Sequence, residues 1–159
     1  MASNLKTYVI GGPGTGKSTL ACGLAAITGL THHDLDRVAW TTLASEGVVR
    51  SDEELAGEVE SILSGTGWIA EGVYHGWTDR LIYGADFVIW LDPPWPVAVW
   101  RVFYRHLRAE LRRDNRLPGW RRLCWFECRT RRWYTRASDD VRGLRPKRLD
   151  GRVRQRSRT

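Results

Sequence analysis

The stretch from Gly11 to Ser18 has the clearest chemical pattern in the chain. It reads Gly-Gly-Pro-Gly-Thr-Gly-Lys-Ser, which fits the G-x-x-x-x-G-K-[S/T] pattern of loops that bind nucleotide phosphates. Glycines let backbone N–H groups converge on an anion, and the N-terminus of a following helix adds a favourable partial charge. We expect Lys17 to reach the β- and γ-phosphates of ATP and the Ser18 hydroxyl to bind Mg²⁺. The predicted nucleotide-binding residues are Gly11, Gly12, Pro13, Gly14, Thr15, Gly16, Lys17, Ser18 and Thr19.

Carboxylates follow two predicted strands and could face this phosphate loop. Asp34 and Asp36 end the segment THHDLD, and alternate side chains of a strand point to one face. We expect Asp34 to hold Mg²⁺ through water, and Asp36 to bind an acceptor or remove the proton from its hydroxyl. The alternative is that Asp36 only caps a turn before Arg37. Glu71 ends the next strand, where it would contact the Mg²⁺-bound water or the acceptor, together with Tyr74, unless it is a solvated loop acid.

Three arginines are expected near the same cleft. Arg101 and Arg105 are four positions apart, so they share one face of a predicted helix that follows the fourth strand. That helix begins at the carboxyl edge of the sheet, where ligands bind in this fold class. The two arginines would offset the negative charge that develops during phosphoryl transfer. Arg80, with Arg37, would bind the phosphate of an acceptor that carries one.

Positive charge is concentrated in the C-terminal part of the chain. Residues 1–100 contain five Lys and Arg against twelve Asp and Glu, a net charge of −7. Residues 101–159 contain twenty against six, a net charge of +14. Within them, residues 105–122 are charged on every side and broken at Pro118 and Gly119. This pattern predicts a short helical lid that closes arginines over phosphates, or else a plain solvated helical hairpin.

The elements that must position these residues alternate between strand and helix. Apolar runs predict strands in 7–12, 67–74 and 85–94, and residues 31–36 are expected to form a short strand that ends in two carboxylates. Helical spacing predicts helices in 17–29, 51–65, 97–113 and 120–136. The first of these is expected to stop at Gly29, and the second opens with a capping box of Ser51 and Glu54. Such alternation indicates an α/β, three-layer α/β/α P-loop fold with a parallel sheet. We expect one kinase domain over 1–146 and a basic, flexible tail over 147–159, with a fifth strand only from 139–144.

Length and composition narrow the class further. A chain of 159 residues is long enough for one domain with a central sheet. The first strand follows Met1 closely, without a signal peptide, and no apolar run reaches membrane-spanning length, so we expect a cytoplasmic protein. Three cysteines without a C-x-x-C pair predict reduced thiols, and Cys124 and Cys128 are expected to pack rather than to bind metal. His32 and His33 are interpreted as strand-end and surface residues.

The chain resembles the small bacterial adenylate-kinase-like proteins known as DNA topology modulation proteins, a branch of the nucleotide and shikimate kinase group. The resemblance covers residues 7–136 and rests on GGPGTGKSTLA, HDLDRVAW, GWIAEGVY, Arg80 with GADFVIWLDPP, and VAVWRVFYRHLR. It implies a three-layer kinase fold similar to nucleoside monophosphate kinases, with ATP, Mg²⁺ and a small acceptor. The family usually has Asp-Gly-Asn-Tyr where this chain has Glu71-Gly72-Val73-Tyr74, so the acid is longer and the amide is lost.

Three functions fit these patterns. The first is an ATP- and Mg²⁺-dependent small-molecule kinase, monomeric or homodimeric, whose acceptor is a nucleoside monophosphate or, with Asp36 as the base, an alcohol. We favour the nucleotide slightly, because arginines outnumber candidate bases. The second is an ATP-dependent nucleic-acid-binding protein or polynucleotide kinase, in which Trp120, Trp125 and Trp133 stack on bases among the arginines. The third is a nucleotide sensor with degraded catalysis.

Overall fold

The computed structural model describes residues 4–40, 49–74 and 76–111. They belong to the first of two compact units, Met1–Leu117 and Pro118–Thr159, and everything below concerns that unit. The elements in chain order are β1 Lys6–Gly11, α1 Lys17–Thr28, β2 Thr31–Asp34, α2 Leu35–Ala39, α3 Asp52–Ser64, β3 Trp68–Gly72, α4 Asp79–Gly84, β4 Phe87–Leu91 and α5 Trp95–Leu111.

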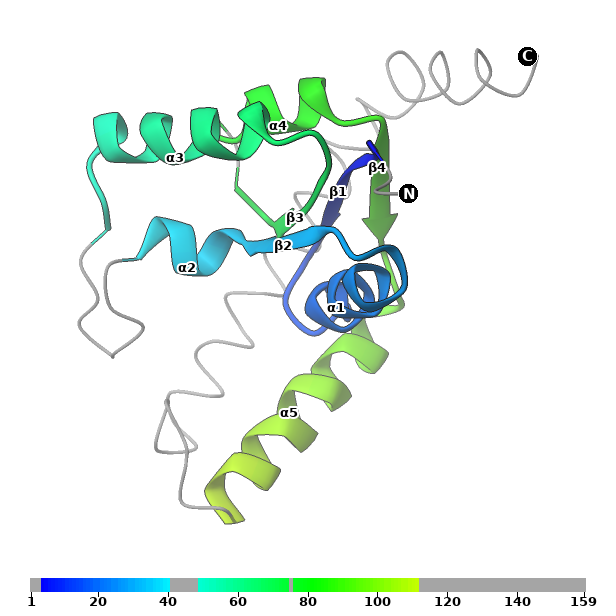
Figure 1. Cartoon of the computed structure of the whole chain (residues 1–159). Helices are drawn as coiled ribbons and strands as arrows, with labels where there is room; N and C mark the ends of the chain where they lie inside the picture. The colour runs from blue at the N-terminus through cyan, green and yellow to red at the C-terminus, as the bar shows by residue number, and fades with distance from the viewer. Residues whose placement is uncertain (1–3, 41–48, 75, 112–159) are drawn as a thin grey trace. The chain divides into compact units, whose positions relative to one another are not determined.

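The described strands form one parallel sheet in the order β2-β3-β1-β4 (Figure 1). In β1, Val9 aligns with Glu71 of β3 and with Ile89 of β4, and Asp34 of β2 aligns with Glu71 from the other side. Because all the described strands run the same way, their carboxyl ends lie at one edge of the sheet. The phosphate loop follows β1 at that edge. The predicted parallel α/β sheet is confirmed.

Two apolar clusters cover the two faces of the sheet. Tyr8 and Ile10 of β1 face one side, where they pack with residues from α2, α3 and α4: Leu35, Val59, Ile62 and Leu81. Val9 faces the other side, where it packs with Ala21 of α1. This alternation follows the period of two of a strand. Helices therefore lie on both faces, as the α/β/α prediction requires, and Figure 1 shows α1 on one side and α3 with α4 on the other.

Two predicted helix ends are confirmed by their caps. Gly29 ends α1 in the left-handed conformation, with φ of 70°, and its N–H donates to the carbonyl of Ala25. Ser51 begins α3 with the predicted capping box, because its side chain accepts from the N–H of Glu54 and the Glu54 carboxylate accepts from the N–H of Ser51. Both signals are local, so the sequence alone is sufficient to read them.

The segment after β2 corrects one prediction. Asp34 is the last residue of β2, whereas Asp36 already lies in the first turn of α2. The prediction that both carboxylates share the face of one strand is therefore wrong. The physical reason is a cap: Oδ1 of Asp34 accepts from the N–H of Asp36 at 3.0 Å and starts a helix where the strand was expected to continue.

Two further features concern the C-terminal part of the described unit. The apolar strand β4 is half-buried, and Phe87 is 47% exposed; β4 is the edge strand of the described sheet. The predicted helix after it extends over α5, so residues 105–111 of the expected lid are helical. The rest of the lid, the proposed fifth strand and the tail lie outside the described residues. Within the described ranges, no helix is both long and apolar enough to cross a membrane.

Candidate functional site

The phosphate loop connects β1 to α1 and presents backbone N–H groups. Gly14 and Gly16 have φ of 76° and 97°, a region that residues with a side chain rarely adopt. Thr15 closes the loop, because its hydroxyl donates to the carbonyl of Gly12 at 2.8 Å. Gly16 is the N-cap of α1 and brings no side chain to the first N–H groups of the helix, and the first turn of α1 has no acid. This helix end is thus suited to an anion.

Lys17 lies half-buried along the loop, with Nζ donating to the carbonyl of Gly12 at 3.2 Å. Burial lowers the pKa of Lys17 from its ordinary value, since removal from water disfavours the charged form. Four further charged groups also act on this pKa, the carboxylates raising it and the guanidinium lowering it: Glu71, Asp36, Arg105 and Asp34. Charged residues from four elements therefore influence the protonation of Lys17.

Asp34 and Asp36 have different surroundings. Oδ1 of Asp34 caps α2. Its Oδ2 forms an ion pair with Arg37, whose Nε lies 3.5 Å away. Asp36 is exposed, and its Oδ1 accepts from the hydroxyl of Tyr74 at 2.9 Å. That hydroxyl in turn accepts from the indole Nε1 of Trp40 at 3.1 Å. Asp34, and not Asp36, is therefore the residue that caps the turn before Arg37, and Asp36 is available to a ligand.

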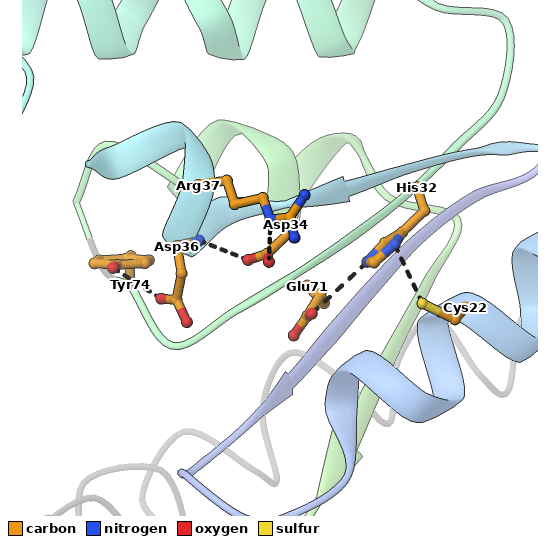
Figure 2. A network of polar contacts seen from close by, with 7 residues as sticks. All are labelled: Cys22, His32, Asp34, Asp36, Arg37, Glu71 and Tyr74. Atoms are coloured by element: carbon orange, nitrogen blue, oxygen red, sulfur yellow. Dashed lines mark hydrogen bonds and ion pairs between the residues drawn. The ribbon is translucent and has the colours of Figure 1, made fainter. Parts of the chain in front are cut away.

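Glu71 is 3% exposed on β3, on the same face of the sheet as α1. Its Oε1 lies 3.7 Å from Nε2 of His32, and neither atom makes a hydrogen bond within the described residues. On the other side of the imidazole, Nδ1 lies 3.6 Å from Sγ of Cys22, as Figure 2 shows. His32 is thus half-buried against Glu71, although the sequence pattern placed it at a strand end.

Helix α5 lies against the phosphate loop. The guanidinium of Arg101 donates to the carbonyl of Thr15 at 3.0 Å. A Cβ atom added at Gly14 would overlap the backbone oxygen of Ala98, so the loop and α5 approach each other at backbone distance. Arg105, one turn further along, acts on Lys17. Arg101 therefore contacts the loop, Arg105 lies one turn away on the same helix, and the catalytic roles of both stay predictions.

Arg80 and Arg37 are engaged elsewhere. Arg80, on α4, forms an ion pair with Glu60 of α3, and both side chains are more than half exposed. Arg37 is 69% exposed and pairs with Asp34. Their predicted role in binding an acceptor phosphate is not tested by these contacts.

The residues around Lys17 are compatible with a complex of ATP and Mg²⁺. Ser18 is exposed at the first turn of α1, and Oε1 of Glu71 is a buried carboxylate oxygen without a hydrogen bond. Within the described ranges, no three His, Cys, Asp or Glu side chains are grouped to hold a metal. Mg²⁺ does not need such a cage, because it keeps several waters and takes one or two carboxylates together with phosphate oxygens.

Sequence reasoning missed three members of the site. Trp40 donates a hydrogen bond to the Tyr74 hydroxyl, and the ring of Trp77 lies against the Tyr74 ring with centroids 5.3 Å apart. His32 contacts Glu71. The tryptophans lie next to predicted site segments, which is the only signal that could have indicated them. The contact of His32 depends on the pairing of β2 with β3 and has no local signal.

No family model matches the chain, and no curated protein matches it. Among solved structures, the chain is similar to a sugar kinase from Janibacter sp. HTCC2649, solved without ligand, with 26% identity and a TM-score of 0.44. That alignment covers 61% of this chain and 65%, less than two thirds, of the other. It is also similar to a gluconokinase from Sinorhizobium meliloti 1021, with 18% identity, a TM-score of 0.49, and 89% and 98% of the two chains covered.

At TM-scores below 0.5, these likenesses carry no conclusion about activity or substrate. The α/β assignment follows instead from the parallel sheet and the phosphate loop of the chain itself. The resemblance to DNA topology modulation proteins is not confirmed.

Proposed function

We propose that the chain is an ATP- and Mg²⁺-dependent phosphotransferase that moves the γ-phosphoryl group of ATP to a small acceptor. The observation that supports this most is the convergence on the phosphate loop. Strand pairing aligns Asp34 of β2 with Glu71 of β3 and Glu71 with Val9 of β1, which leads into the loop. Arg101 of α5 donates to the loop carbonyl of Thr15. The proposal assigns these acids to Mg²⁺ and to the acceptor.

Each group has a distinct part in this proposal. The loop N–H groups and Lys17 hold the β- and γ-phosphates, and Arg101 and Arg105 offset charge on the oxygens of the moving phosphoryl group. Ser18 would hold Mg²⁺ directly, and Asp34 would hold it through water. When bound, Mg²⁺ supplies further neutralisation of phosphate charge.

Two acceptor chemistries are open under this proposal. A nucleoside monophosphate needs no base, because its phosphate is already a nucleophile, and it would use Arg37 and Arg80 as cations. A hydroxyl compound needs a base, for which Asp36 is placed beside Tyr74. The nucleic-acid alternative rests mainly on residues 112–159, which lie outside the described residues, and no described contact favours it.

The test compares Lys17→Ala with Lys6→Ala, in which a lysine of the same unit is removed away from the loop, where its Nζ donates to the carbonyl of Leu63. We expect Lys17→Ala to weaken binding of ATP and to lower ATP consumption by on the order of 100-fold, because a charge aimed at the transferred group is lost. Lys6→Ala should keep both. Equal ATP binding in wild type and Lys17→Ala would exclude the proposed function.

A further inference from the structure

Asp36 is held by a directed pair of hydrogen bonds. The indole N–H of Trp40 donates to the Tyr74 hydroxyl, and the hydroxyl donates to Oδ1 of Asp36. A hydroxyl has one hydrogen, so the indole donor directs that hydrogen toward the carboxylate. Figure 2 shows the Tyr74 hydroxyl facing Asp36 from the loop after β3. This pair of hydrogen bonds occupies one carboxylate oxygen, and no hydrogen bond within the described residues reaches Oδ2, which we assign to a ligand.

Tyr74, which links Trp40 to Asp36, is packed against the apolar core. The ring of Tyr74 packs against the core cluster that lies between the sheet and helices α2 to α4, and against the ring of Trp77. The backbone carbonyl of Tyr74 accepts from the hydroxyl of Thr78 at 2.7 Å. Burial, together with the charge of Asp36, raises the pKa of Tyr74, so the phenol stays protonated and able to donate. Asp36 therefore has a fixed position although it is exposed.

The charge around Asp36 does not suit an acceptor that carries a phosphate group. Two carboxylates lie close together at the start of α2, those of Asp34 and Asp36. Within the described residues, the two arginines that the sequence suggested for an acceptor phosphate each face a carboxylate, Arg37 that of Asp34 and Arg80 that of a glutamate of α3. A phosphomonoester placed beside Asp36 would meet like charge, whereas an uncharged hydroxyl would not.

We infer that the acceptor offers a hydroxyl and carries no phosphate group, and that Tyr74 and Trp40 position Asp36 as the base for that hydroxyl. This inference rests on the proposed function and names its substrate class. It reverses the slight preference for a nucleoside monophosphate that the arginine count gave.

The residues of the site account for the bond that forms, the bond that breaks and the proton that is released. The acceptor oxygen forms a bond to the γ-phosphorus, while the bond from that phosphorus to the β–γ bridging oxygen breaks and its electron pair leaves with ADP. The acceptor's proton passes to Oδ2 of Asp36 and later to solvent. Tyr74 does not touch the reacting atoms in this scheme; it acts by fixing the carboxylate.

The first arm of the test uses matched acceptor pairs that differ by one phosphate. Adenosine and AMP, guanosine and GMP, cytidine and CMP, thymidine and TMP, and glucose and glucose 6-phosphate are each offered with ATP and Mg²⁺. ATP consumption and phosphorylated product are measured for each pair. ATP hydrolysis is also measured without an added acceptor, so that water serves as the hydroxyl compound. We expect faster transfer to the member without phosphate in any accepted pair. Faster transfer to the phosphorylated member overturns the inference and leaves the proposed function standing.

The second arm uses Asp36→Asn and Tyr74→Phe. Tyr83→Phe is the matched control, because it removes the same hydroxyl from a tyrosine of α4 that is 55% exposed. With the best acceptor, or with water if none is accepted, Asp36→Asn should lower kcat by on the order of 100-fold or more. Tyr74→Phe should lower kcat by about 10-fold or more at unchanged KM for ATP, with a decrease in melting temperature of only about 1–6 °C. Tyr83→Phe should match wild type.

The remaining outcomes separate the two proposals. Unchanged kcat in Asp36→Asn or in Tyr74→Phe overturns the inference, and so does a Tyr74→Phe defect that appears only as lost stability. ATP binding that depends on Lys17, without any ATP consumption under any of these conditions, overturns the proposed function itself. In that case the inference falls with it.

Discussion

The close approach of the phosphate loop to α5 predicts a large effect of adding one methyl group at Gly14. A Cβ atom there would overlap the backbone oxygen of Ala98 and would lie 2.8 Å from Cγ2 of Val102. Gly14 also has φ of 76°, where alanine is strained. Gly14→Ala therefore combines two costs, a left-handed backbone and an overpacked contact with a helix that cannot yield as a flexible side chain would.

The two costs can be estimated separately. The left-handed conformation costs an alanine about 1–2 kcal/mol, and overpacking against a well-packed neighbour costs about 1–3 kcal/mol. The free energy of unfolding should thus fall by about 2–5 kcal/mol. For a domain of this size, 1 kcal/mol moves the melting temperature by about 2–4 °C, so we expect a decrease of roughly 4–20 °C.

Gly29→Ala is the matched control. Gly29 has φ of 70°, and among the described residues no atom lies within 4 Å of its added Cβ. It should therefore show the backbone cost alone, about 1–2 kcal/mol. Thermal unfolding of both variants is followed by circular dichroism without nucleotide, so that lost ATP binding does not contribute. Equal decreases in the two variants would refute the packing of α5 against the loop.

Three further predictions follow from other contacts. Arg105→Ala should lower kcat far more than it weakens ATP binding, as measured by steady-state kinetics and calorimetry, because we propose that Arg105 acts mainly on the moving phosphoryl group. Ser51→Ala should lower the free energy of unfolding in urea by about 1 kcal/mol. That loss of stability should be smaller in acid, because hydrogen bonds from Ser51 lower the pKa of Glu54. The stability gained from this shift is present above the ordinary carboxyl pKa and disappears as the pH falls through the lowered pKa of Glu54. Burial raises the pKa of Tyr8 to about 12, so an ultraviolet titration should show this phenol ionising well above the ordinary tyrosine pKa of about 10. The stability that it confers should be full below about pH 10 and be lost as the pH rises to about 12.

Much of the fold could be predicted because its signals are local. The glycine spacing of the phosphate loop, the capping box at Ser51 and the stop at Gly29 each lie within a few residues, and all three are present where they were expected. The apolar runs predicted the strands β1, β3 and β4, since buried strands need such runs. The alternation of these elements is sufficient to indicate a parallel sheet.

The end of β2 was not predictable in the same way. The pattern Asp34-Leu35-Asp36 fits both a strand with two carboxylates on one face and a helix start capped by the first of them. Packing decides between the two, because Leu35 is completely buried in the core cluster below α2. With Leu35 there, Asp34 becomes the cap and Asp36 turns toward Tyr74.

The sequence by itself determined that a phosphate loop lies between a buried strand and a helix, with acids and arginines along the chain that could serve it. Only the tertiary structure decided which of them meet. Arg101 reaches the loop from 86 positions away, Tyr74 reaches Asp36 from 38 positions away, and Arg80 is paired with a glutamate of α3 instead. Such contacts depend on strand order and helix packing, which are set by the summed burial of many apolar side chains and leave no mark beside the residues that they join.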